Sequence, residues 1–465
     1  MQSKKKQVLL VGLFQKECIV CDESLKVLQA SDLNSEFDFK KITIHRYLWN
    51  PRGKNNDYCL EHYMNHKSMN HVNQKIDEIE EKYNIPSIRR LYKSDPLMQG
   101  VKQPKAITAV WKYFDAWENF FKKNPFDYVF SFIGPEVPRR SLYYVCKKRG
   151  IKILSCQFSF FKETQFWMEH EQWKDEKFKI YKYSEISERE IESIHKEIKE
   201  LTSSKHNITH FRTFKIRIED FKILLRRLKA RFYYDRWNYR FRIHFYVIRG
   251  LTRVIRAHIG RFLYQRPRFD KEKFVFFPLH QLGDFQLCVR APHLDQVEVI
   301  RNIAESLPNK YVLYTKEHPN FVGGYPLSFL LKIRRIENVR LINPGIHPHQ
   351  LIPKAQFVIT INSSAGFESL AFDVPVVTLT KSEYSHHGLT YDVENLIDLP
   401  EIFRKVIREG IPYTEEEKIA FFFSLKKYSV IGPPKPFEFV MSRENILAVP
   451  QSIREKILRY ESSGH

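Results

Sequence analysis

Polar side chains follow three predicted strands in the second half of the chain. Residues 274–278, 311–315 and 357–361 each have the short apolar pattern of a buried strand. The polar residues after these strands are, in chain order, His280, Gln281 and Asp284, then Lys316, Glu317 and His318, then Asn362, Ser363 and Ser364. Ligands of open α/β sheets bind beyond the carboxyl ends of the strands. The three sets are therefore candidates for one binding site.

The third set is the most informative, because it opens a predicted helix at residues 364–372. Asn or Ser at a helix start caps free backbone N–H groups. Those groups, with hydroxyls beside them and the positive helix end behind, can bind phosphate. Gly366 would let a ligand or backbone come close, and Glu368 could accept hydrogen bonds from ribose hydroxyls. The alternative is a well-capped helix with nothing bound.

His318 is followed by Pro319, which makes the turn rigid. Its imidazolium could lie near a diphosphate or phosphodiester, or protonate a leaving phosphate. The alternative is a loop histidine whose hydrogen bonds are satisfied by the protein.

Strands and helices alternate around these residues. In the second half, a further strand is predicted at 375–379 and helices at 295–307 and 364–372. In the first half, strands are predicted at 7–13, 127–133 and 151–155, with a helix at 141–150 between the last two. Strand–helix–strand units imply parallel sheets, so we expect an α/β fold with two Rossmann-like domains. The expected boundaries are 1–180 for the first domain, 181–270 for a basic helical connector, 271–400 for the second domain, which holds the candidate binding residues, and 401–465 for a helical tail.

The basic connector carries much of the formal net charge of +22. Residues 211–266 hold 16 Lys and Arg against three acids, interleaved with aromatic residues. Three interpretations are open: a solvated helix face, contact with an anionic membrane, or a nucleic-acid surface. The last is disfavoured because no nucleic-acid-binding motif surrounds the span, so we expect no nucleic-acid partner. No run of 18 apolar residues and no secretory signal pattern occurs, which favours a cytoplasmic protein.

Cys18, Cys21, Cys59 and His62 have the spacing of zinc ligands, with His66 and His71 nearby. The two halves of that set lie far apart in the sequence. Six thinly spread cysteines also suit reduced, buried thiols in the cytoplasm. We therefore expect no metal.

Residues 274–392 resemble the capsule polysaccharide biosynthesis family, which includes bacterial transferases of the acidic sugar Kdo. The resembling segments are FPLHQLGD, LDQVEVIRNIAESLP, YVLYTKEHPN, PHQLIPKAQFVITINSSAGFESLAFDVPVVTL and EYSHHGLTYDV, with GPEVPRR in the first half. The family implies a glycosyltransferase fold of the GT-B type. By resemblance, His318-Pro319 and Ser363-Ser364 hold the nucleotide phosphate and Glu368 contacts the nucleotide sugar. The family often has a proline and a glutamate after the first histidine, whereas Leu282-Gly283-Asp284 stands here.

The resemblance implies a glycosyltransferase that moves a sugar from a CMP- or UDP-linked donor to a surface polysaccharide or its lipid-linked precursor. The predicted ligand-binding residues are His280, Lys316, Glu317, His318, Asn362, Ser363, Ser364, Gly366 and Glu368. His318 is also a catalytic candidate, and Glu136, in a Gly-Pro-Glu turn after a strand, or Asp284 is the predicted acceptor base. No cofactor is expected beyond the nucleotide-sugar donor, which is a substrate, and the basic span predicts peripheral contact with the inner face of the cell membrane. The alternatives are a nucleotide-sugar epimerase of the same fold and a non-catalytic membrane-associated assembly factor.

Overall fold

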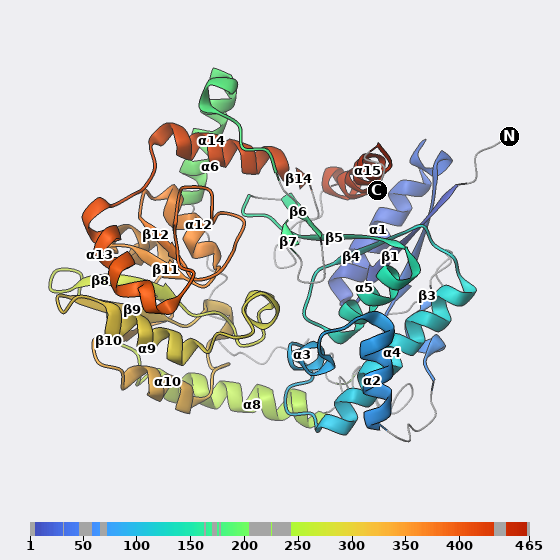
Figure 1. The fold of residues 1–465 in the computed structure, drawn as a ribbon, viewed down its shortest axis with the longest axis horizontal. Helices are drawn as coiled ribbons and strands as arrows, with labels where there is room; N and C mark the ends of the chain where they lie inside the picture. The colour runs from blue at the N-terminus through green and yellow to red at the C-terminus, as the bar shows by residue number, and fades with distance from the viewer. Residues whose placement is uncertain are drawn as a thin grey trace. The chain divides into compact units, whose positions relative to one another are not determined.

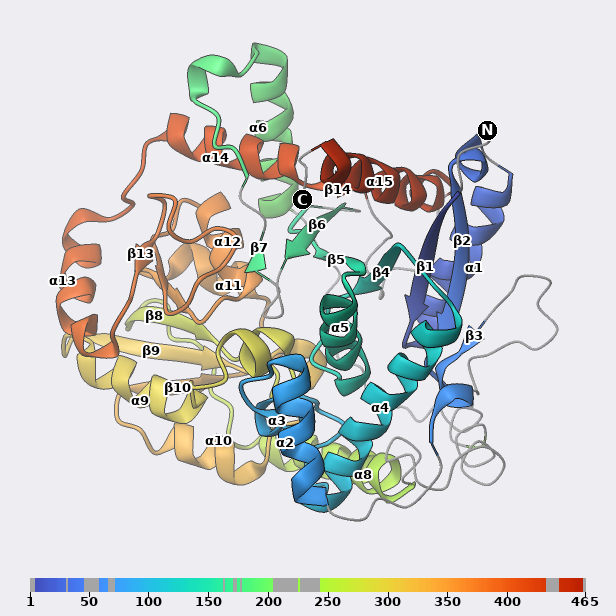
Figure 2. The same ribbon diagram turned by 45° about the vertical axis from the view of Figure 1, so that its right-hand side comes forward.

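The computed structural model describes residues 5–30, 32–45, 58–65, 72–161, 164–169, 174–175, 178–203, 225, 243–431 and 443–462 (Figures 1 and 2). The chain divides into two compact units. Unit 1 contains the described residues of 1–177 and 428–465, and unit 2 contains those of 178–221 and 243–427.

The sheet of unit 1 has the strand order β14-β6-β5-β4-β1-β2-β3, with β7 paired to β6. Its strands are β1 (Lys6–Gly12), β2 (Phe37–Thr43), β3 (Tyr58–Cys59), β4 (Tyr128–Phe132), β5 (Lys152–Phe158), β6 (Thr164–Glu169), β7 (Lys174–Asp175) and β14 (Val430–Ile431). The pairs β3–β2, β2–β1, β1–β4 and β4–β5 are parallel. The pairs that β6 forms with β5, β7 and β14 are antiparallel. The predicted unit of β4, α5 and β5 is confirmed, and Gly150 ends its helix with a φ of 69°.

The helices of unit 1 are α1 (Gln15–Gln29), α2 (Val72–Tyr83), α3 (Ile88–Lys93), α4 (Gln103–Lys123), α5 (Val137–Arg149) and α15 (Arg443–Ser462), with short 3₁₀ turns at Asp32–Ser35 and Leu60–Tyr63. Helices α4 and α5 pack together, and Trp117 of α4 donates to the carbonyl of Pro138 at 2.9 Å. Helix α15 packs on α1, and its Val449, Ile453 and Ile457 join the core under β1 and β4. The end of the chain is thus part of the first unit, not of a separate tail.

The sheet of unit 2 has the order β10-β9-β8-β11-β12-β13, and every pair in it is parallel. Its strands are β8 (Lys273–Pro278), β9 (Tyr311–Lys316), β10 (Val339–Ile342), β11 (Val358–Thr360), β12 (Val376–Thr378) and β13 (Tyr391–Asp392). The two expected Rossmann-like sheets are therefore confirmed. Strands β10 and β13 were not predicted.

Helices cover both faces of this second sheet. They are α6 (Glu188–Ser203), α8 (Ile243–Gly260), α9 (Gln296–Ser306), α10 (Leu327–Arg334), α11 (Pro348–Leu351), α12 (Ser364–Ala371), α13 (Leu399–Glu409) and α14 (Glu415–Tyr428). Short turns lie at Tyr183–Glu185, Gln286–Arg290, Pro319–Phe321, Ile352–Lys354 and Leu396–Asp398. The expected boundaries differ from this division, since α6, α8, α13 and most of α14 all belong to unit 2.

Several expectations concern residues outside this description. Most of the basic span 211–266, including Arg226, Arg227, Lys229 and Arg231, lies outside the described residues, as do His66 and His71. Cys18, Cys21 and Cys59 are buried, and the described residues contain no group of three side chains placed to hold a metal ion. Among the helices that the structure describes, none is long and apolar enough to cross a membrane.

Candidate active site

Three neighbouring strands bring the predicted residues to one edge of the second sheet. Strand β8 lies between β9 and β11, and all three are parallel. Their carboxyl ends therefore point the same way, and each leads into one of the three polar segments. Helix α12 starts directly after β11, at Ser364.

His318 lies at the start of the short turn after β9, where its ring caps the backbone. Its Nδ1 accepts from the backbone N–H of Asn320 at 3.2 Å and lies 3.1 Å from the Gln281 amide nitrogen. Because Nδ1 accepts, the proton of the neutral ring is on Nε2, which has no hydrogen-bond partner among the described residues. Burial lowers the pKa of His318 to about 4; Lys316 and His280 act in the same direction, and the charges of Asp284 and Glu368 oppose it. At neutral pH His318 is thus a neutral imidazole in this structure, and not the imidazolium that we expected.

His280 and Asp284 face each other after β8. Nδ1 of His280 lies 3.9 Å from Oδ2 of Asp284, and Oδ1 of Asp284 accepts from the backbone N–H of Gln286 at 3.0 Å. Burial alone would raise the pKa of Asp284, but His280, the Gln286 N–H and His318 together lower it. Asp284 is therefore a carboxylate at neutral pH, as a general base requires.

Both oxygens of Glu368 are held by neighbours. Ser364 Oγ donates to Oε1 at 3.2 Å, and His349 Nε2 lies 3.0 Å from Oε2. Ser363 caps α12, since its Oγ accepts from the backbone N–H of Ala365 at 3.1 Å. Ser364 is exposed at the helix start, where its backbone N–H has no acceptor among the described residues and its hydroxyl donates to Glu368.

Two buried polar atoms at this edge have no hydrogen-bond partner in the described structure. They are Nε2 of His280 and Oδ1 of Asn362. The other end of the Asn362 amide donates to Gln286 Oε1 at 3.1 Å. An unsatisfied buried polar atom costs about 1–3 kcal/mol, so water or a ligand group is expected to serve these atoms.

Lys316 and Glu317 are adjacent in sequence but belong to different surroundings. Lys316 Nζ donates to the Ile346 carbonyl at 2.8 Å, and burial lowers its pKa to about 8, against the charge of Glu368. Glu317 is fully buried away from the other predicted residues, where the Tyr264 hydroxyl donates to its Oε1 at 2.7 Å. Burial raises the pKa of Glu317 to about 7, although Tyr264 opposes this.

Gly366 meets another part of the protein where we expected room for a ligand. A Cβ at this position would lie 2.3 Å from the Tyr384 hydroxyl oxygen. That hydroxyl donates to the Ser363 carbonyl at 2.6 Å. Glycine is required here because Tyr384 packs on the start of α12, so Gly366 shapes the site without opening it.

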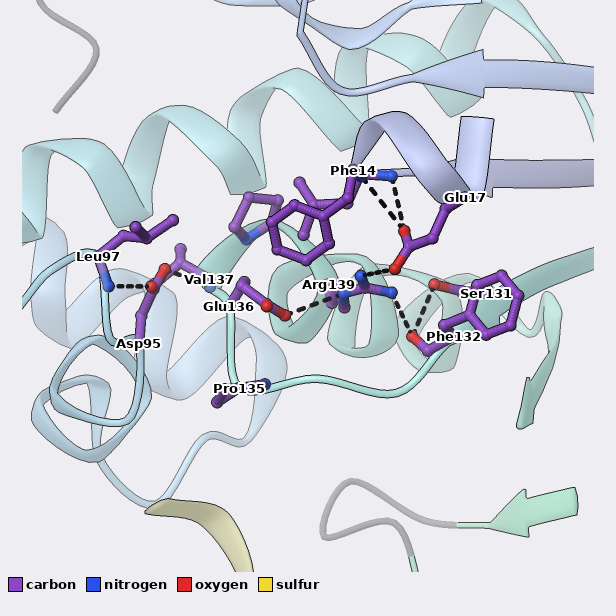
Figure 3. Close-up of polar contacts among 12 residues, drawn as sticks. Phe14, Glu17, Asp95, Leu97, Ser131, Phe132, Pro135, Glu136, Val137 and Arg139 are labelled. Carbon is purple, nitrogen blue, oxygen red and sulfur yellow. Dashed lines mark hydrogen bonds and ion pairs between the residues drawn. The ribbon is translucent and has the colours of Figure 1, made fainter. Parts of the chain in front are cut away.

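Glu136, the predicted base in unit 1, stands at the N-cap position of α5 after β4, but its side chain makes no capping hydrogen bond (Figure 3). Its Oε2 accepts from Arg139 Nε at 2.9 Å, and Arg139 Nη2 reaches Glu17 Oε1 at 2.5 Å. The third contact of Arg139 is the Phe132 carbonyl at 2.7 Å. Oε1 of Glu136 has no partner among the described residues. A Cβ on Gly134 would lie 2.1 Å from Glu136 Oε2, so the glycine before this turn makes room for the carboxylate.

The sequence analysis did not predict three residues that hold the candidate site residues in place. They are His349, Gln286 and Arg139. His349 follows β10, a strand that was not predicted, and reaches a residue 19 positions away. Gln286 lies in a single π-helical turn at Gln286–Arg290, a feature that periodicity does not reveal. The contact of Arg139 with Glu136 could have been predicted, because residues three positions apart are neighbours on a helix surface.

Comparison with known proteins gives a family match for a segment in the second half of the chain. Residues 226–401 match the family of capsule polysaccharide biosynthesis proteins, so the resemblance is confirmed for this part of the chain. Protein FixF of Sinorhizobium fredii is 31% identical over 124 residues, which are 25% of this chain and 28% of FixF. The match thus spans less than a third of that relative.

Solved structures of low similarity complete the comparison. The beta Kdo 2,7 transferase KpsC of Thermosulfurimonas dismutans is 16% identical, with 72% of this chain and 87% of that chain covered and a TM-score of 0.34. The UDP-GlcNAc 2-epimerase of Neisseria meningitidis, bound to UDP-GlcNAc, is 12% identical, with 97% and 100% covered and a TM-score of 0.31. At such scores these likenesses support no functional argument.

Proposed function

We propose that this chain, whose residues 226–401 match the family of capsule polysaccharide biosynthesis proteins, is a glycosyltransferase. It would move a sugar from a nucleotide donor to a capsular polysaccharide or to its lipid-linked precursor. The observation that carries the proposal is the polar edge of β8, β9 and β11, where His318 and Ser364 offer hydrogen-bond donors within the family-matching region.

The donor phosphate would bind at the start of α12. The Ser364 N–H, the positive helix end and His318 Nε2–H all present hydrogen to an anion, and the Ser364 hydroxyl could join them by turning from Glu368. Lys316, buried beneath this edge, adds a positive charge without using a surface position. These groups would stabilise the negative charge that develops on the leaving nucleotide in the transition state of the sugar transfer.

Recognition of the nucleoside would fall to Glu368. Its two oxygens keep free lone pairs beyond their contacts with Ser364 and His349, so they can accept from ribose hydroxyls. The acceptor hydroxyl needs a base, and Glu136 or Asp284 would supply it. Glu136 has one oxygen without a partner among the described residues, which makes it the first choice.

The proposed acceptor determines where in the cell the enzyme would act. A lipid-linked glycan precursor is held at the membrane, so the enzyme would act at the inner face of the cell membrane as a peripheral protein. The acidic sugar that the family resemblance implies makes a CMP-linked donor the first candidate and a UDP-linked donor the second.

A donor screen with the purified chain tests the proposal. CMP-linked and UDP-linked sugars would be incubated with and without an acceptor glycan, and nucleotide release followed. We expect release that rises when an acceptor is added. Conversion of a UDP-linked sugar to its epimer without acceptor would indicate the epimerase instead, and failure to bind any nucleotide would indicate a non-catalytic assembly factor.

A further inference from the structure

Helix α8 exposes a continuous apolar stripe. Leu251, Ile255 and Ile259, spaced four residues apart and so on one side of the helix, are exposed by 55%, 55% and 47%. Phe262, in the turn that follows, is exposed by 72%. Single exposed apolar residues are ordinary, but a row of four on one element marks an interaction surface.

The same element is strongly basic. No acidic residue occurs between Asp235 and Asp270. The Lys and Arg residues of 243–268 are Arg249, Arg253, Arg256, Arg261, Arg266 and Arg268. Helix α10 lies beside α8 (Figure 1) and adds exposed Leu331, Lys332 and Arg335. We call Leu251, Ile255, Ile259, Phe262, Leu331, Lys332 and Arg335 the α8–α10 face.

We propose that the α8–α10 face docks on an anionic lipid surface. Aliphatic and aromatic side chains bordered by arginine and lysine, with no acid between them, fit the boundary between lipid headgroups and acyl chains. A nucleic acid would use the charges but would leave the aliphatic stripe in water. This inference rests on the proposed function, since a lipid-linked acceptor gives the docking its purpose.

The other side of α8 is fixed to unit 2, so the stripe cannot turn inward. Arg253 donates to the carbonyls of Val322 at 3.0 Å and Asn320 at 2.7 Å. At Gly323, with a φ of 71°, a Cβ would lie only 2.2 Å from the Arg253 carbonyl oxygen. Arg334 of α10 donates to the Leu263 carbonyl at 2.8 Å and ties the two helices together at the end of α8. Within unit 2, the apolar stripe therefore lies on the side of α8 that faces away from the sheet.

Vesicle co-sedimentation of the full chain tests the proposal. The probes are vesicles of phosphatidylcholine alone and of equal parts phosphatidylcholine and phosphatidylglycerol. We expect binding to the anionic vesicles, little to the neutral ones, and release as salt shortens the Debye length. The variant L251S/I255S/I259S should bind anionic vesicles at least about tenfold more weakly, because each inserted side chain of this size contributes strongly to partitioning.

Matched variants distinguish binding through the α8–α10 face from nonspecific binding through any exposed apolar or basic residue. Ile397, exposed by 77% in the turn before α13, gives the apolar control I397S, which should bind as wild type does. K332Q/R335Q should weaken binding several-fold, whereas R404Q/R408Q on α13 should not. All these variants change exposed residues, so their thermal midpoints should match that of the wild type.

Four results would overturn the proposal. Three of them are wild-type protein that stays in the supernatant with anionic vesicles at low salt, triple-serine protein that binds normally, and I397S protein whose binding weakens equally. Binding lost only in K332Q/R335Q would indicate a polyanion surface and would also overturn it. Nucleotide titration of the triple-serine variant should be unchanged, so failure of the donor site and failure of docking are distinguishable.

Discussion

His349 Nε2 lies 3.0 Å from Glu368 Oε2, on the side of the carboxylate opposite to Ser364. The histidine follows β10, and its own backbone N–H donates to His347 Nδ1 at 3.0 Å. Two residues from different strand ends thus fix one carboxylate at the start of α12. The sequence predicted only the contact of Glu368 with the nucleotide sugar. The structure adds the contacts of Glu368 with His349 and Ser364, and each residue can be tested by its own substitution.

Replacing His349 by Ala should release Glu368 and weaken nucleotide binding by a few-fold, the worth of about 1 kcal/mol. Because Glu368 is assigned to the ribose, the affinity for pyrophosphate should not change. Calorimetric titration of CMP, UDP and pyrophosphate into both proteins measures this difference. An equal loss for pyrophosphate would mean that His349 acts on the phosphate instead.

Ser364→Ala and His318→Ala should each weaken nucleotide and pyrophosphate binding by about tenfold or more. Hydrogen bonds to a charged group are worth roughly 1.5–3 kcal/mol. Ser328→Ala, at an exposed position of α10, is the matched control and should bind as wild type does. Unchanged affinity in both site variants would remove these residues from the donor site.

Glu136→Gln should lower turnover by roughly 10²–10⁴ with donor affinity kept, if Glu136 is the acceptor base. Glu17→Gln is the informative control, because Glu17 pairs with the same Arg139 but is given no chemical role. It should reduce stability and leave turnover within a few-fold of wild type. Equal losses in the two variants would assign Glu136 to holding Arg139, and near-normal turnover of Glu136→Gln would leave Asp284 as the base.

The buried carboxyl of Glu317 should make stability depend on pH. Its pKa is raised to about 7 from an unfolded value near 4.5, mainly by burial. The folded state therefore favours the proton, and stability that is present below pH 4.5 is lost as pH rises to about 7. Glu317→Gln should keep the Tyr264 contact and remove this loss, so it should gain up to about 3 kcal/mol on wild type at pH 8 and little at pH 4.

Thermal unfolding of the two proteins at both pH values measures the difference directly. The pKa of His318 is lowered to about 4, so its contribution has the opposite sign: it is present above pH 6.5 and lost as pH falls to about 4. Comparison with Glu317→Gln cancels that contribution because both proteins contain His318. An equal stability difference at pH 4 and pH 8 would contradict the assignment.

Gly366→Ala should destabilise the protein by roughly 1–3 kcal/mol, because the new methyl group would overlap the Tyr384 ring and hydroxyl. Gly250→Ala in α8 is the matched control: a Cβ there meets nothing within 4 Å, and alanine favours a helix. That control should be neutral or stabilising. If Gly366→Ala instead keeps full stability, Tyr384 must be able to move away from α12.

The strands that carry the candidate site could be predicted from the sequence. The directions in which the side chains of the site point could not. Apolar runs located β8, β9, β11 and β12, and the parallel sheet then brought their ends together. Lys316 and Glu317 were treated as one set, although neighbouring side chains of a strand point to opposite faces. That alternation sends Glu317 to Tyr264 and keeps it away from His318.

Contacts between residues distant in sequence were beyond sequence reasoning. The need for glycine at 366 comes from Tyr384, 18 positions later, and the orientation of Glu368 comes from His349. The protonation state of His318 depends on burial and four surrounding charged or titratable groups, which no spacing reveals. Residue types therefore pointed to the location of the site, while its chemistry depends on packing.

The attachment of α8 to the loop after His318 bears on how this protein can be divided for experiments. A fragment that begins at residue 271, where the nucleotide-binding domain was expected to start, would lack Arg253, Ala257 and Tyr264. Gly323 and the carbonyls of Asn320 and Val322 would then face solvent, and Glu317 would lose its hydroxyl partner. Such a fragment would bind nucleotide poorly although every residue predicted to touch the donor is present. A faithful fragment of unit 2 has to include α8 and also α6, which packs on α12.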